Sequence, residues 1–146
     1  MAYRFPLAAV LRLRESIERR EERSLQILQM EIVRVSRTVE ELTASIAGAR
    51  EAQERTMRKP MPAGHLHSVL LECQSEANRR SALLQHLESL KKKHDEQIRV
   101  YHDAHRDREM LSDLYSRSKR AYEVEQTKSQ QKQLDDLFVG RYYRNG

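Results

Sequence analysis

The sequence predicts an all-α protein, a long antiparallel two-helix coiled-coil hairpin with a C-terminal single-helix overhang. Two observations lead to this fold class. First, residues 65–139 contain no proline or glycine, and only Gly48 interrupts the stretch between Pro6 and Pro60. Second, apolar residues recur at helical spacing on both sides of the one strong breaker cluster, residues 60–64. Each run therefore predicts a helix whose apolar stripe is covered by the other run.

The first helix is expected at about residues 6–57. Apolar positions that alternate steps of three and four residues are Leu25, Leu28, Ile32, Val35, Val39, Leu42, Ile46 and Ala49. Such a stripe is about two residues in seven wide and is typical of a left-handed coiled coil. A second stripe precedes it, from Leu7 to Ile17. The polar residues 18–24 between the stripes predict a stutter or a loose stretch but no break, because all of them tolerate helix.

The turn is expected at about 58–64, the second helix at about 65–139 and a short tail at 140–146, which makes residues 1–146 a single coiled-coil domain. The apolar stripe leaving the turn consists of Leu66, Val69, Leu70, Cys73, Ala77, Leu84, Leu87 and Leu90. Beyond it the stripe becomes more polar, beginning with His94. The second helix is thus less regular than the first.

The two runs differ in length, which predicts an overhang. In an antiparallel hairpin with this turn, paired residues have numbers that add to roughly 122, so Leu7 lies near Tyr115. The helical pattern beyond Tyr115 then extends on the order of 30–35 Å without an intramolecular partner. Such a helix is marginal in water by itself. Within it Leu134, Leu137 and Phe138 have the spacing of a helix that binds in a groove.

Composition and motifs argue against an enzyme. No phosphate-binding glycine loop, metalloprotease motif or nucleophile–base pair occurs, and the six histidines lack the neighbours that a metal site needs. We therefore expect no catalytic, cofactor-binding or metal-binding residues and no cofactor. The net charge of +5 is spread over mixed signs, which gives no basic arm for nucleic acid. No apolar stretch is long enough to span a bilayer, and the single Cys73 fits a reducing cytoplasm.

The chain opens with an aromatic residue, leucines and an arginine–acid run, Phe5-Pro6-Leu7-Ala8-Ala9-Val10-Leu11-Arg12-Leu13-Arg14-Glu15. This opening resembles the start of the FliJ family of bacterial flagellar export proteins. The C-terminal stretch is more specific: Arg108-Glu109-Met110-Leu111-Ser112-Asp113-Leu114, Tyr122-Glu123, Gln131-Lys132-Gln133-Leu134-Asp135-Asp136-Leu137 and Arg141. With the length and the position of the turn, the resemblance covers essentially the whole chain.

The resemblance implies a cytoplasmic, non-enzymatic component of the flagellar type III protein export apparatus, peripheral at the inner face of the cytoplasmic membrane. Its partners would be the hexameric flagellar export ATPase, the cytosolic domain of the export gate and export chaperones. Motif by motif, the partner-facing residues carried over are Leu111, Leu114, Tyr122, Gln131, Lys132, Leu134, Asp135, Asp136 and Arg141. The groove-binding spacing adds Leu137 and Phe138. Leu111 and Leu114 also fit the paired stripe.

One region departs from the family. Where its members contact the gate, near the tip, this chain has Ser45, Gly48 and Ala52 and no aromatic residue, so a gate contact is not mapped by the motif.

Three other interpretations stay open from the sequence alone. The equivalent stalk protein of a virulence type III secretion system shares the architecture. A generic coiled-coil scaffold, such as a dimer of extended chains, would lack the turn that the proline–glycine cluster predicts. A nucleic-acid binder would require strong salt-dependent binding to nonspecific DNA.

Overall fold

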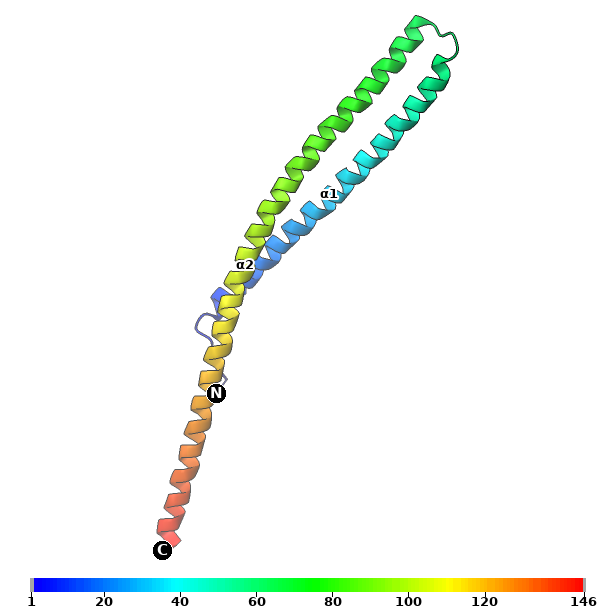
Figure 1. The fold of residues 1–146 in the computed structure, drawn as a ribbon. Coiled ribbons are helices and arrows are strands. Elements are labelled where there is room, and N and C mark those ends of the chain that lie inside the picture. Colours follow the sequence, from blue (N-terminus) through cyan, green and yellow to red (C-terminus); the bar gives the residue numbers. More distant parts are fainter. Residues whose placement is uncertain (1, 146) are drawn as a thin grey trace. The chain divides into compact units, whose positions relative to one another are not determined.

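The computed structural model describes residues 2–145, which form two long helices joined by a short turn. Helix α1 spans Ala8–Met57 and helix α2 spans Ala63–Asn145, and no strand occurs among the described residues (Figure 1). The two helices pack against each other along the stripes that the sequence marks. The all-α hairpin is confirmed.

The helix ends differ by a few residues from the expected boundaries. α1 begins at Ala8, where the amide of Ala8 donates to the Phe5 carbonyl, 3.1 Å away. α2 begins already at Ala63, because the carbonyl of Pro62 accepts hydrogen bonds from the amides of His65 and Leu66. Proline fits this position because its missing N–H would have no helical partner there.

The predicted tail at 140–146 is wrong for the residues described, since α2 continues to Asn145. A single Gly140 costs about 1 kcal/mol relative to alanine within a helix, and no proline or capping contact follows to end it. The helix therefore continues beyond the glycine.

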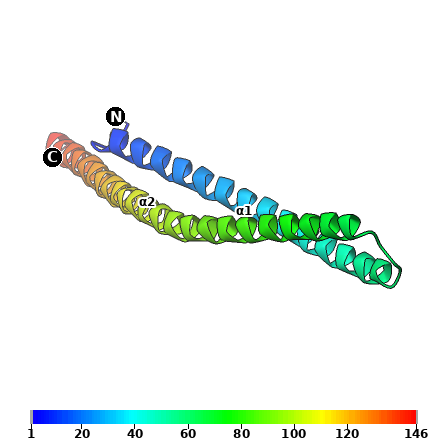
Figure 2. The same cartoon turned by 90° about the horizontal axis from the view of Figure 1, so that it is seen from above.

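The chain divides into two compact units. The unit formed by residues 21–101 contains the turn, and in it the two helices run alongside each other in Figure 1 and cross in the view of Figure 2. Its core is a cluster of Val35, Val39, Leu87 and Leu90, each at most 9% exposed. The stripe predicted on the first helix is confirmed, because every one of its eight residues is buried or half-buried. On α2, however, Leu83 packs against the core instead of Leu84.

The other unit combines residues 1–20 with residues 102–146. Residues 2–5 lie outside the helix, and Phe5 is buried with its ring 5.3 Å from that of Tyr115. The Tyr3 ring contacts those of Tyr115 and Tyr122, and its hydroxyl is hydrogen-bonded to Ser118. Pairing therefore continues to Tyr122, and the expectation that α2 lacks a partner beyond Tyr115 is wrong. Non-helical chain spans about twice the length per residue of a helix, so a short segment covers two further turns of α2.

The predicted register is confirmed in each unit. Arg14 Nη1 lies 3.3 Å from the Asp107 carboxylate in one unit, and Arg80 Nε donates to Thr43 Oγ1 over 2.8 Å in the other. Both pairs of numbers agree with the expected total of roughly 122. The expected grouping of residues 1–146 into a single domain stays a prediction.

Candidate functional site

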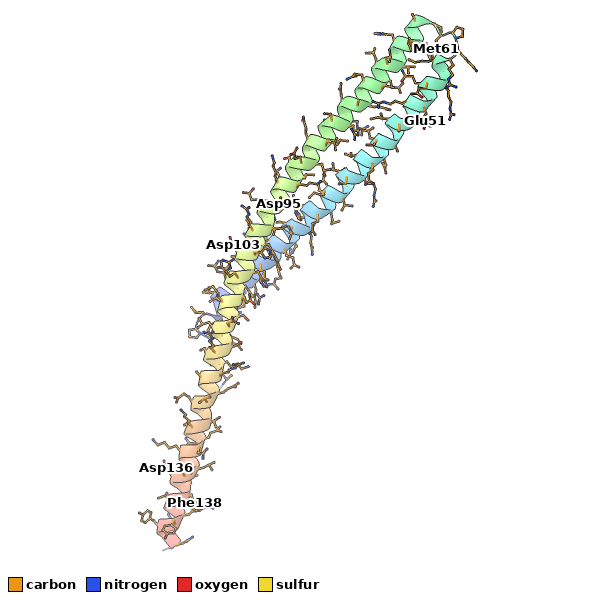
Figure 3. The ribbon with its side chains drawn as sticks, viewed as in Figure 1. Glu51, Met61, Asp95, Asp103, Asp136 and Phe138 are labelled. Carbon is orange, nitrogen blue, oxygen red and sulfur yellow. The ribbon has the colours of Figure 1, made fainter. Side chains whose placement is uncertain are left out.

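The C-terminal part of α2, residues 123–145, is the first candidate site, and we call it the overhang. Every residue of it is exposed. Leu134 is 66% exposed, Leu137 67% and Phe138 73%, and the labelled Asp136 and Phe138 stand out from the ribbon (Figure 3). Large apolar side chains grouped in the open are typical of surfaces that bind another molecule.

One face of the overhang carries the predicted anchors. Successive residues of a helix are turned by about 100°, which places Leu134, Leu137, Phe138 and Arg141 within one side of α2. Phe138, Arg141 and Tyr142 line a shallow hollow at its end. The structure thus brings together the apolar residues and the arginine of the predicted site.

The remaining polar residues of that site do not gather with the anchors. Gln131 lies beside the anchor face, whereas Lys132 and Asp136 project from the opposite side and Asp135 from between. All four are exposed. A single flat surface that covers the anchors would therefore not reach Lys132 or Asp136.

Two apolar residues of the overhang were missed from the sequence. Val139, 50% exposed, and Tyr143, 78% exposed, lie on the side of α2 away from Leu134. They do not share the spacing of the anchor group, but the aromatic pair Tyr142-Tyr143, two residues after Gly140, is a visible signal in the sequence. The overhang is apolar on two sides.

The three N-terminal members of the predicted site lie in the paired part of α2. Tyr122 is half-buried, with its ring 5.1 Å from that of Tyr3. Leu111 and Leu114 line a hollow together with Val10 of α1, and Leu114 is the more exposed of the two. Tyr122 thus contacts the N-terminal segment that precedes α1, and the two leucines lie beside α1, as the sequence had allowed.

The polar stretch 18–24 is continuous helix that makes specific contacts with α2. Arg108 Nε donates to Glu18 Oε2 over 2.6 Å, and His105 Nδ1 lies 2.8 Å from Glu18 Oε1. The hydrogen bond from Arg108 lowers the pKa of the Glu18 carboxyl below its usual 4.5, against the opposing effect of partial burial. In the other unit Gln97 Nε2 donates to Glu21 Oε2 over 2.6 Å. A polar layer replaces apolar packing there, so the expected loose stretch is a firm contact.

Neither a metal site nor a membrane span is found in the described part of the chain. No group of three His, Cys, Asp or Glu residues within residues 2–145 is arranged to hold a metal ion. None of the helices in that range contains a stretch apolar enough to cross a membrane.

Comparison with protein families gives one match that covers nearly all of the chain. The family is described as Flagellar FliJ protein, and its model matches residues 3–146. Comparison with curated proteins gave no match, and neither did comparison with solved structures.

Proposed function

The chain belongs to the FliJ family, a component of the flagellar protein export apparatus, and we propose that it acts there as a non-enzymatic stalk that binds the hexameric export ATPase. The observation that carries this proposal is the overhang. Its 23 residues, 123–145, correspond to a helix of about 34 Å, and none of them is buried. A helix of this length is marginal in water unless something packs on it.

The distribution of apolar residues favours a partner that encloses the helix. Leu134 and Phe138 lie on one side of α2, and Val139 and Tyr143 lie on the other. A groove covers one side of a helix only, and would leave the second pair in water. The central opening of an ATPase ring can cover both sides at once.

The hairpin end that contains the turn is proposed to contact the cytosolic domain of the export gate, and the protein to assist export chaperones. Around the turn Met57, Leu70 and Leu71 are 47–58% exposed, which supplies apolar contact area without an aromatic residue. The place of action that follows is cytoplasmic, peripheral at the inner face of the membrane.

The test is the hydrolysis rate of the cognate flagellar export ATPase, measured together with its hexamer population. The purified full chain is expected to raise both. Leu134→Glu/Phe138→Glu places two charges on the anchor face and should abolish both effects, because burying an unpaired carboxylate is costly. A wild-type chain without effect at saturating concentration would refute the proposal.

A matched control separates the overhang from the rest of the chain. Met30→Glu/Val33→Glu introduces the same two charges at exposed apolar positions of α1. It should stimulate the ATPase as the wild type does. If the control fails as the overhang variant does, the ring contact is not specific to the overhang.

A further inference from the structure

A second apolar surface lies on the outer face of α1. Ile27 is 67% exposed, Met30 72% and Val33 55%, whereas Val35 on the packed face is 3% exposed. Each of the three side chains leaves α1 within about 60° of their common mean direction. That direction is opposite the stripe that packs on α2. They line an open hollow formed by α1 residues between 26 and 41 alone. We call these three residues the outer patch.

Arginines bracket the outer patch along the helix. Arg23 precedes Ile27 by four residues and Arg37 follows Val33 by four residues, so each lies one turn beyond the apolar group on the same face. Both arginines are exposed. Arg34 differs, because its guanidinium is hydrogen-bonded to Glu31. Arg23 and Arg37 thus stand 14 residues, or about 21 Å, apart on one line, and the exposed Glu41 follows one turn beyond Arg37.

A second copy of this chain does not fit the outer patch. A two-fold axis near Met30 would set Arg23 of one copy against Arg37 of the other, and like charges across an interface are repulsive.

A lipid surface fits poorly as well. Helices that lie in a membrane interface carry bulky Trp, Phe or Leu residues along a long apolar face. The outer patch spans two turns and has no aromatic residue. An apolar stripe two turns long with a charge beyond each end can be covered by one short amphipathic helix.

We propose that the outer patch is the docking surface for an acidic amphipathic helix of another protein. The partner helix carries apolar residues over about two turns, and one carboxylate on each side of them, spaced to meet Arg23 and Arg37. Burial of Ile27, Met30 and Val33 supplies contact area, and the two charge pairs set position and direction. The inference does not rest on the ATPase contact, since the overhang shares no residue with this surface.

Two synthetic peptides test the proposal on the full chain. One has a leucine stripe over two turns and glutamates 14 residues apart on the same face, and its twin carries lysines in place of the glutamates. Fluorescence anisotropy at low salt should show binding of the acidic peptide, with the lysine twin at least about tenfold weaker. Binding should weaken as salt is raised, because the charge pairs lie at the exposed rim.

Variants decide whether the contact is at the outer patch. Met30→Glu/Val33→Glu should weaken the acidic peptide at least about tenfold, and Arg23→Glu/Arg37→Glu should reverse the preference between the peptides. Lys91→Glu/Lys92→Glu makes the same charge change at exposed positions of α2 and should leave binding unchanged. Circular dichroism melts confirm that each variant is folded.

Three results would overturn the proposal. Equal weakening by the Lys91→Glu/Lys92→Glu control would show nonspecific attraction to a basic protein. Self-association in sedimentation that Met30→Glu/Val33→Glu removes would assign the surface to a second copy. Binding to anionic vesicles without binding to the acidic peptide would assign it to lipid. The Leu134→Glu/Phe138→Glu variant must bind the acidic peptide as the wild type does, so failure of the ATPase contact and failure of this docking surface are read separately.

Discussion

Replacing His94 by leucine is expected to stabilise the hairpin. His94 follows Leu90 by one turn in the stripe that α2 packs against α1, and its side chain is 20% exposed. Its Nε2 atom is buried and has no hydrogen-bond partner among residues 2–145. Its Nδ1 atom lies 3.9 Å from the exposed Asp95 carboxylate, which is too long and too solvated to add much.

The magnitude follows from the buried nitrogen. A buried polar atom without a partner costs about 1–3 kcal/mol. His94→Leu removes this cost and places an apolar side chain in a coiled-coil stripe, at the expense of a weak contact with Asp95. We expect a net gain of about 1–2 kcal/mol in the free energy of unfolding, or a melting temperature higher by roughly 3–6 °C for a chain of this size.

Thermal and urea unfolding followed by circular dichroism measure this gain. The control is His67→Leu, which makes the same change at an exposed position near the turn and should stay within about 0.5 kcal/mol of the wild type. If His94→Leu is neutral or destabilising while the control is neutral, the Nε2 atom of His94 is not a buried atom that lacks a hydrogen-bond partner. The reasoning is then refuted.

Three further predictions concern contacts within the individual units. Glu18→Gln should cost about 1 kcal/mol at pH 7, because it removes a charge-assisted hydrogen bond. The pKa of Glu18 is lowered in the folded chain, so its contribution to stability is present above pH 4.5 and is lost as the pH falls through the lowered pKa. Acid unfolding curves of wild type and variant should therefore converge. Leu90→Ala should cost about 2–3 kcal/mol in urea unfolding, whereas Leu134→Ala, in the overhang, should cost less than about 0.5, and equal costs would contradict the assigned core. Phe5→Ala should release the N-terminal segment; a local loss of about 1.4 kcal/mol speeds tryptic cleavage there about tenfold, and an unchanged rate would mean that the Phe5 contact with Tyr115 does not hold it.

The fold was predictable because its determinants are local and periodic. The proline–glycine cluster marks the turn, and a 3.5-residue repeat admits few arrangements other than helix on helix. The register followed from the position of the turn, since both helices advance by the same rise per residue. The contact between Arg14 of α1 and Asp107 of α2 agrees with this predicted register.

What the sequence did not reveal is set by contacts between residues distant in the chain. Tyr3 and Phe5 precede the helix, and no periodicity indicates that they cover α2 as far as Tyr122. Glu18 appears as a gap in an apolar stripe until Arg108 is placed opposite it. Gly140 follows the predicted end of the second helix, but the cost of one glycine is too small to stop a helix there.

The two candidate surfaces differ in the same way in how far the sequence predicts them. The exposure of Leu134, Leu137 and Phe138 could be anticipated from unequal helix lengths, because a segment without an intramolecular partner must be exposed. The outer patch could not be separated from the core by composition, since Met30 and Val33 are ordinary neighbours of Ile32 and Val35 in the sequence. Only the direction in which each side chain leaves α1 distinguishes them, and that depends on which face α2 occupies.

A two-helix coiled coil buries one narrow stripe on each helix, and this limits what exposed apolar residues can do for it. Side chains such as Met30 and Phe138 cannot reach the interface between α1 and α2, so they add almost nothing to the stability of the hairpin. Exposed to water, such side chains promote unwanted association. Their free-energy benefit therefore arises only when another molecule covers them. The same physics gives this chain two kinds of surface: an overhang apolar on opposite sides, which requires enclosure, and an outer patch apolar on one side between two arginines, which requires a single helix of opposite charge.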